Sequence, residues 1–194
     1  MNNILILFSH PAIHKSRVHK ELCRAARSVA GVTFHDLYGK YPDFYINVKW
    51  EQKLLVEHEI IIWQHPVYWY SCPALMKEWI DVVLEHNFAY GKQGTHLKNK
   101  KLMSAITTGG SARVYNESGS NHYTIRQLLA PFHQTAMLCG MEYLPPFVIH
   151  GSHMLSKSDI LAYGDQYARL LSGLRDGTIP YGRFSEVTYM NELI

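Results

Sequence analysis

The chain is poor in cysteine, and its three cysteines lie far apart in the sequence. Cys23, Cys72 and Cys139 form no C-x-x-C pair, so neither a disulfide framework nor a cysteine-based zinc site is expected. A long apolar run is also lacking. Residues 4–8 are too few for the core of a signal peptide and have no basic flank, and no stretch reaches transmembrane length. These absences predict a cytoplasmic protein that reaches the inner membrane only through a partner.

The chain also lacks a large excess of positive or negative charge, and several familiar motifs are absent. The net charge of +3 is too weak and too scattered to indicate nucleic-acid binding. No G-x-G-x-x-G follows the first apolar run, and there is no P-loop, G-x-S-x-G or H-E-x-x-H motif. Among twelve histidines, the close pairs 10/14 and 150/153 lack cysteine or acidic partners, so no native metal is expected.

Five short apolar runs alternate with segments of helical periodicity. We expect strands at residues 3–9, 32–37, 58–64, 101–107 and 147–150, and helices at 16–29, 51–57, 74–85, 124–140 and 158–175. This alternation predicts an α/β fold with a parallel sheet covered on both faces. The expected architecture is a flavodoxin-like three-layer αβα sandwich with five strands in the order 2-1-3-4-5.

The boundaries of these elements carry their own signals. Ser16 and Ser158 are placed to cap the first and last helices, and Pro131 predicts a kink or a late start in the fourth. A chain of 194 residues is most simply one domain. We expect residues 1–176 to form it and residues 177–194 to be a C-terminal tail packed on the domain or on a dimer partner.

The loop after the first strand contains groups that suit a phosphate. In the expected strand order, the loops after strands one, three and four lie side by side at the edge where open α/β sheets bind ligands. Ser16, His10 and Lys15 supply donors there, beside the free N–H groups of a helix start. Capping of the helix alone would also explain Ser16.

The other two loops suit the face and the edge of a flat ring. The third strand ends at His65-Pro66, and the aromatic residues Tyr68, Trp69 and Tyr70 follow. These aromatics offer a wall for a planar ligand, or they simply pack over the sheet edge. After the fourth strand, the Thr-Thr-Gly-Gly segment at 107–110 permits close approach of the backbone to a ligand. A sharp turn that needs positive φ is the other explanation for two glycines.

These motifs together resemble the NAD(P)H:quinone oxidoreductase family. The likeness rests on HPxxxxS from His10, QHPVYWYSCPALMKEWID from Gln64, TTGG with a downstream tyrosine, DLYGKYPDFYI and LPPFVIHG, and it covers about residues 3 to 170. Within that family, the chain most resembles ancillary subunits of bacterial glutathione-regulated potassium-efflux systems. The resemblance implies a flavodoxin-like fold, a homodimer with sites at its interface, and ping-pong transfer of two electrons from NAD(P)H through a flavin to a quinone-like acceptor.

The resemblance also implies a set of site residues. His10, Ser16 and Val18 would border the flavin phosphate and ribityl chain; Pro66, Val67, Tyr68, Trp69 and Tyr70 would flank the ring; Thr107, Thr108, Gly109 and Gly110 would bind its polar edge. Tyr115 would stabilise charge on the reduced ring. Its histidine partner would be His122, although the intervening loop is one residue longer than the family pattern and a plain surface position is the alternative. No adenine-binding extension is evident, which favours FMN over FAD.

Two further functions remain open at this level. The chain could act as a regulatory ancillary subunit of a membrane potassium-efflux system, whatever its turnover, or as a flavodoxin-type electron carrier that does not use NAD(P)H. The aromatic segment 41–50 and the tail 181–194 are candidate dimer or partner surfaces, and ordinary covering loops are the alternative.

Overall fold

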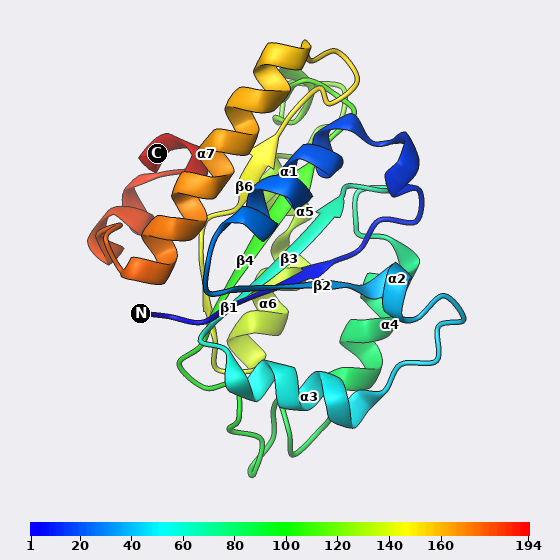
Figure 1. Cartoon of the computed structure of the whole chain (residues 1–194), viewed down its shortest axis with the longest axis vertical. Coiled ribbons are helices and arrows are strands. Elements are labelled where there is room, and N and C mark those ends of the chain that lie inside the picture. Colours follow the sequence, from blue (N-terminus) through cyan, green and yellow to red (C-terminus); the bar gives the residue numbers. More distant parts are fainter.

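A parallel sheet forms the middle layer of the protein, seen in Figure 1 in a computed structural model that describes residues 1–194 apart from the side chain of Tyr181. The strands are β1 (Ile4–Phe8), β2 (Val32–Asp36), β3 (Ile60–Pro66), β4 (Lys101–Thr107), β5 (Glu142–Tyr143) and β6 (Phe147–Ile149). Their order is β2-β1-β3-β4-β5, and β6 also pairs with β4. All pairs are parallel. The predicted flavodoxin-like α/β fold and strand order are confirmed.

Strands β5 and β6 occupy one edge position, because both pair with β4. Lys101 and Leu102 pair with Glu142 and Tyr143, whereas residues 105–107 of β4 pair with 147–149 of β6. The two prolines at 145 and 146 lie between the two strands. Proline has no N–H to give to a sheet, so it divides the edge strand into two pieces. The sequence predicted only the second piece.

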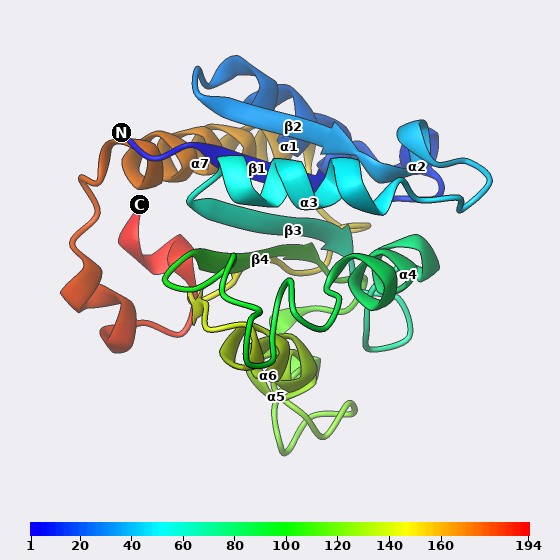
Figure 2. The same ribbon diagram turned by 90° about the horizontal axis from the view of Figure 1, so that it is seen from below.

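Helices cover both faces of this sheet (Figures 1 and 2). They are α1 (Arg17–Ser28), α2 (Leu37–Lys40), α3 (Val48–Glu57), α4 (Ala74–Val83), α5 (Ile125–Leu128), α6 (Ala130–Leu138) and α7 (Lys157–Asp176), with 3-10 turns η1 (Ile13–Lys15), η2 (Ala112–Val114), η3 (Tyr181–Glu186) and η4 (Met190–Leu193). Alternate residues of β1 point to opposite faces: Ile4, Ile6 and Phe8 pack with α1 and α7, and Leu5 and Leu7 with α3, α4 and α6. Within the described residues, no helix is both long and apolar enough to cross a bilayer.

Helix boundaries confirm two expectations and correct one. Ser16 caps α1, since its hydroxyl accepts the His19 N–H at 3.1 Å. The helix expected at 124–140 breaks into α5 and α6, with Pro131 in the first turn of α6. The prediction that Ser158 caps the last helix was wrong. Ser156 caps α7 in a capping box with Asp159, which satisfies two backbone N–H groups reciprocally.

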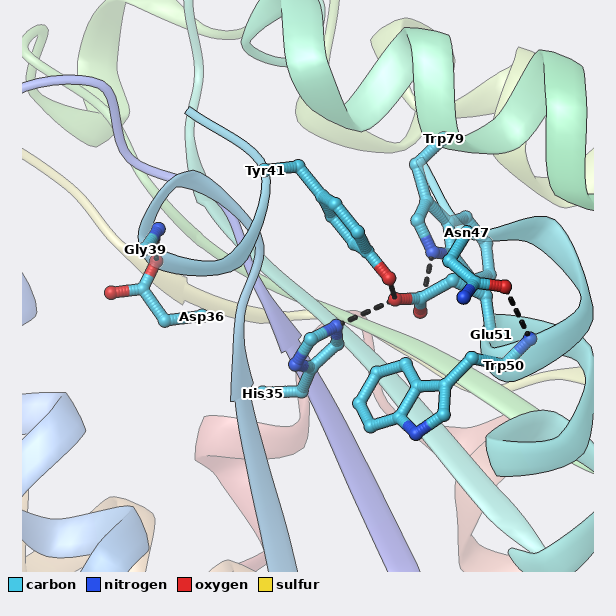
Figure 3. A network of polar contacts seen from close by, with 8 residues as sticks. All are labelled: His35, Asp36, Gly39, Tyr41, Asn47, Trp50, Glu51 and Trp79. Atoms are coloured by element: carbon cyan, nitrogen blue, oxygen red, sulfur yellow. Dashed lines mark hydrogen bonds and ion pairs between the residues drawn. The ribbon is translucent and has the colours of Figure 1, made fainter. Parts of the chain in front are cut away.

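A buried carboxylate joins three elements on the α3 face (Figure 3). Glu51 of α3 is fully buried and accepts hydrogen bonds from Tyr41 Oη at 2.6 Å, His35 Nε2 at 2.8 Å and Trp79 Nε1 at 2.8 Å. Burial and the bond to Glu51 raise the pKa of Tyr41, which therefore stays protonated and donates. The network ties β2, the connection after α2, and α4 to α3.

The C-terminal tail folds back against the edge of the sheet. Helix α7 ends at Gly177, whose φ of +68° is the left-handed conformation that glycine adopts without strain. Met190 is fully buried, and its N–H donates to Pro146 O at 3.0 Å. Asn191 Oδ1 accepts the N–H of Val148 in β6 at 2.9 Å. The tail thus satisfies a donor that an edge strand would otherwise expose.

Candidate functional site

Four loops meet at the carboxyl edge of the sheet and enclose two adjoining cavities of about 470 and 340 Å³. Three are the expected loops after β1, β3 and β4, and the fourth follows β6. The larger cavity is lined by His10, Ala12, Lys15, Ser16, Arg17, Val18, Pro66, Val67, Tyr68, Thr107, Gly109, Ser152 and His153. The smaller is lined by Val67, Trp69, Tyr70, Gly109, Gly110, Val114, Tyr115 and Asn121. Both volumes are typical of small-molecule sites, which span roughly 300–1,000 Å³.

The larger cavity has a cationic end at the start of α1. Lys15 and Ser16 line it, and the first turn of α1 begins there. Arg17 also lines the cavity, and its Nη2 donates to Leu155 O at 3.0 Å and His153 O at 3.4 Å. It therefore fastens α1 to the loop after β6. A lysine and a helix N-terminus together favour an anion at this end.

His10 is a neutral donor in the wall of the same cavity. Its Nδ1 accepts the N–H of Ala12 at 3.1 Å, so the proton of the ring is on Nε2. Burial lowers the pKa of His10, with its own backbone hydrogen bond and Asp36 opposing the change. The side chain is only 6% exposed. An uncharged imidazole N–H is therefore available to an acceptor in the cavity.

The aromatic loop is a tight turn with an unfavourable backbone. Tyr68 and Ser71 exchange backbone hydrogen bonds of 3.2 and 3.0 Å, and the two residues between them have positive φ, +49° for Trp69 and +63° for Tyr70. For bulky residues this conformation costs about 1–2 kcal/mol each. The Trp69 side chain is 94% exposed, so it does not pack over the sheet edge. Strain that holds an indole in solvent at the rim of a cavity is typical of a binding site.

The two glycines after β4 are needed for space rather than for a special φ. Neither Gly109 nor Gly110 is among the residues with positive φ. A β-carbon at Gly110 would lie 2.8 Å from Val114 Cγ2 and 3.2 Å from Tyr115 Cε2. Gly109 lines both cavities, and a β-carbon there would meet only the His153 ring, at 3.5 Å. Gly110 therefore lets Tyr115 approach, and Gly109 leaves the boundary between the cavities open.

Tyr115 meets Asn121 in the smaller cavity, and His122 lies outside it. Burial raises the pKa of Tyr115, while hydrogen bonding by Thr108 and Asn121 opposes the rise. Tyr70 Oη donates to Asn121 Oδ1 at 3.3 Å. His122 is exposed, has φ +57° and lines neither cavity. Because this loop is one residue longer than the family pattern, the residue that faces Tyr115 is Asn121, one position before His122. The extra residue was the sequence signal for this shift.

The loop after β6 contributes residues that sequence patterns did not assign to the site. Ser152 and His153 line the larger cavity. His150 lies behind the smaller one, with its ring 5.7 Å from that of Tyr115. Thr108, the remaining predicted residue, is 1% exposed and lies behind the loop that lines the cavities. In the sequence, the close spacing of His150 and His153 indicates only a metal pattern, which no cysteine or acidic partner supports. Among the residues that the structure describes, no three histidine, cysteine or acidic side chains gather to bind a metal.

A family model described as a flavodoxin-like fold matches residues 2–171 of the chain. Among curated proteins, the glutathione-regulated potassium-efflux system ancillary protein KefG of Erwinia tasmaniensis is 40% identical over 179 residues, which are 92% of this chain and 95% of that protein. The residues that the family model matches include all four loops of the site.

Three solved structures are similar over nearly their whole length. General stress protein 14 from Treponema denticola, in complex with FMN, has TM-score 0.81 and 36% identity over 90% of this chain and 98% of its own. An NADPH-quinone reductase from P. pentosaceus has TM-score 0.76 and 32% identity over 86% of this chain and 97% of its own. A protein named as a thermophilic tryptophan halogenase from Streptomycin violaceusniger has TM-score 0.81 and 42% identity over 85% and 95%.

Proposed function

The chain belongs to the flavodoxin-like NADPH-quinone reductase family, and from this premise we propose that it is an FMN-dependent oxidoreductase that passes two electrons from NAD(P)H to a quinone-like acceptor by a ping-pong mechanism. One observation carries the proposal. Loops far apart in the sequence enclose two joined cavities, one with a cationic helix start and the other with exposed aromatic rings. A flat ring with a phosphate tail needs both features.

The residues present fit FMN. Ser16, Lys15 and the N–H groups at the start of α1 would hold its phosphate, and the 107–110 loop would hold the polar edge of its ring. Trp69 and Tyr70 would flank the ring, where their strained turn already presents them. FMN in the similar general stress protein 14 supports this cofactor over FAD. When bound, the flavin supplies the acceptance and donation of hydride that no side chain provides.

Hydrogen-bond donors at the smaller cavity would stabilise negative charge during the reaction. Tyr115 stays protonated at neutral pH because burial raises its pKa. Within the described part of the chain, the N–H groups of Gly109 and Gly110 donate to no protein acceptor and remain free to donate to a ligand. Asn121 accepts from Tyr70 through Oδ1, which leaves its amide N–H₂ as a donor. Donors arranged in advance around one cavity stabilise a developing anion at little reorganisation cost.

Visible flavin absorbance tests the proposal most directly. Protein reconstituted with FMN should be yellow, should bleach under anaerobic conditions when NADPH is added, and should recover its colour when a benzoquinone follows. Initial-rate plots at several quinone concentrations should be parallel lines. Apoprotein that fails to bind FMN would contradict the proposal. Bound flavin that only an added reductase reduces would instead indicate an electron carrier.

A second function, as an ancillary subunit of a membrane potassium-efflux system, is favoured by the 40% identity to a protein of that name. The two functions are compatible. We propose the surface of Phe44, Tyr45 and Trp50 as the contact, since Tyr45 is 85% exposed on the connection before α3. The replacement Tyr45→Ser should weaken co-sedimentation with membranes that contain the efflux protein and leave quinone reduction intact. Unchanged co-sedimentation would remove this surface from consideration.

The domain division, the assembly and the location are proposals as well. We propose one catalytic domain, residues 1–176, carrying the tail 177–194, in a cytoplasmic homodimer that is peripheral to the inner membrane through its partner. Light scattering on the purified chain should give twice the 22.4 kDa mass of one copy. A monomeric mass at micromolar concentration would contradict the dimer.

A further inference from the structure

Thr107, which ends β4, and the next residue, Thr108, are each bonded to a histidine, from opposite faces of the sheet; His19 is fully buried and His150 is half-buried. Thr107 Oγ1 lies 3.1 Å from Nε2 of His19, which α1 supplies. Thr108 Oγ1 lies 3.1 Å from Nδ1 of His150, which follows β6. Successive residues of a strand point to opposite faces, so one histidine approaches from each side. The threonines begin the loop that lines both cavities.

The hydrogen bonds of Thr108 determine which nitrogen of His150 carries the proton. The hydroxyl has one hydrogen, which Thr108 Oγ1 shares between Gly110 O, at 2.8 Å, and the phenol of Tyr115, so that none is left for His150. The same oxygen must therefore accept from His150, whose Nδ1 is protonated. His150 Nε2 is buried without a partner within the described structure. The chain of bonds runs from His150 through Thr108 to Gly110, and it fixes the path of the loop.

His19 repeats this arrangement with its other nitrogen. Its side chain is fully buried, and its Nδ1 has no partner among the described residues. A buried N–H without an acceptor costs more than a bare lone pair, so the proton belongs on Nε2, facing Thr107. Thr107 then accepts from His19, and its own hydrogen is free to turn to the larger cavity, which Thr107 lines. Burial, with His10 and His65 nearby, lowers the pKa of His19, so the ring is neutral.

We propose that His19 and His150 are positioning residues that orient the hydroxyls of Thr107 and Thr108 from the two faces of the sheet. This inference rests on the proposed FMN site. His19 directs the Thr107 hydrogen toward the ligand. His150 directs the Thr108 hydrogen to the backbone and, with its ring packed against Tyr115, keeps the loop beside that phenol. Neither histidine contacts the cofactor in this arrangement.

His19 and His150 bond their threonines through different ring nitrogens, Nε2 and Nδ1 respectively. Asparagine and glutamine replacements should therefore have opposite effects at the two positions. An asparagine amide places an N–H near the position of histidine Nδ1, and a glutamine amide places one near Nε2. The replacements His150→Asn and His19→Gln should therefore keep the bond to threonine, whereas His150→Gln and His19→Asn should lose it. If the two histidines only filled space, the preference between asparagine and glutamine would not reverse from position 19 to position 150. Thr108→Val removes the hydroxyl with little change in shape and should match His150→Gln.

The first readout is the affinity of the apoprotein for FMN, measured by quenching of flavin fluorescence. We expect the two retaining variants within about threefold of the wild-type Kd and the two disrupting variants at least about tenfold weaker. The exposed residue His96 provides a control, since His96→Gln and His96→Asn should bind FMN like wild type. Similar affinities for the Asn and Gln variants at each position would overturn the inference. Urea unfolding of each apoprotein verifies that the variants fold.

A second readout does not need FMN or folded variants. Nitrogen-15 chemical shifts of the wild-type apoprotein should show the Nε2–H tautomer for His19 and the Nδ1–H tautomer for His150. The reverse tautomers would overturn the inference even if the protein binds FMN. If the wild-type protein fails to bind FMN, the proposed function fails, and these shifts still decide whether the histidines face the threonines as described.

Discussion

Tyr115 packs so closely on Gly110 that a β-carbon on the glycine would lie 3.2 Å from Cε2 of the phenol ring. Val114 Cγ2 would be closer still, at 2.8 Å. The replacement Gly110→Ala should therefore displace the 114–115 segment and lower kcat for quinone reduction by about ten- to a hundredfold, because the donor loses its alignment. Gly182→Ala is the control, since nothing lies within 4 Å of its β-carbon position. Wild-type kcat in Gly110→Ala would show that Tyr115 is not a donor to the reaction.

Gly109 should respond differently from its neighbour. A β-carbon there would make only ordinary contact with the His153 ring, so Gly109→Ala should unfold at the same urea concentration as wild type. It would project where the two cavities join, however, and should weaken FMN binding by about tenfold or more. Isothermal titration of FMN into the apoprotein measures this effect. Unchanged affinity would place the ligand away from Gly109.

The two serine caps separate helix stability from ligand binding. Ser16 and Ser156 each accept an N–H at 3.1 Å at the start of α1 and α7, respectively. Replacing either serine by alanine should lower the free energy of unfolding by about 1 kcal/mol. Only Ser16→Ala should also weaken FMN binding, because only that cap lines a cavity. Equal FMN affinities in the two variants would reduce Ser16 to a helix cap.

Glu51 should be among the most sensitive positions for stability. Glu51→Ala would leave the donors of His35, Tyr41 and Trp79 buried without an acceptor, which should cost about 3–5 kcal/mol in urea unfolding. Glu57→Ala, on the same helix, removes only an exposed pair with Lys53 at 3.7 Å and should change stability by less than about 1 kcal/mol. Comparable losses in the two variants would contradict the structural role of the network.

His65 should make the protein less stable in acid. Burial lowers the pKa of His65 to about 4, although its hydrogen bond to Pro66 O opposes the change, and the ordinary value is 6.5. Between these two pH values the unfolded chain binds a proton that the folded protein does not, so stability falls as pH decreases below 6.5. At pH 5 the loss from this residue should be about 2 kcal/mol.

The variant His65→Asn isolates this contribution. An asparagine amide retains a donor near the Nδ1 position for Pro66 O but does not titrate. Urea unfolding at pH 7.5 and pH 5 should show a smaller acid loss in the variant than in wild type. The loss that remains reflects other groups, including His10 and His19, whose pKa values burial also lowers. Identical pH dependence in the two proteins would contradict the assignment to His65.

Much of the fold could be predicted because its signals are local. The apolar runs at residues 4–8 and 60–63 are buried on both faces, as their unbroken hydrophobic sequences indicate. Alternation with helical segments was enough to predict the parallel sheet, whereas its strand order was expected from the flavodoxin-like fold and is confirmed by the structure. The cap at Ser16 and the late start of α6 at Pro131 likewise depend on one or two turns of backbone. Short-range chemistry determines such features before distant parts of the chain meet.

Irregular loops and long-range pairs were decided only by the tertiary structure. Whether Asn121 or His122 faces Tyr115 depends on how a loop closes, and counting residues does not give that path. His19 and Thr107, 88 residues apart, meet because α1 packs over the end of β4. By itself the sequence determined that the loops after β1, β3 and β4 lie near the carboxyl edge of the sheet, whereas the loop after β6 joined them only in the tertiary structure. The protonation, hydrogen-bond partners and cavity access of their side chains follow from packing between segments that have no local signal for one another.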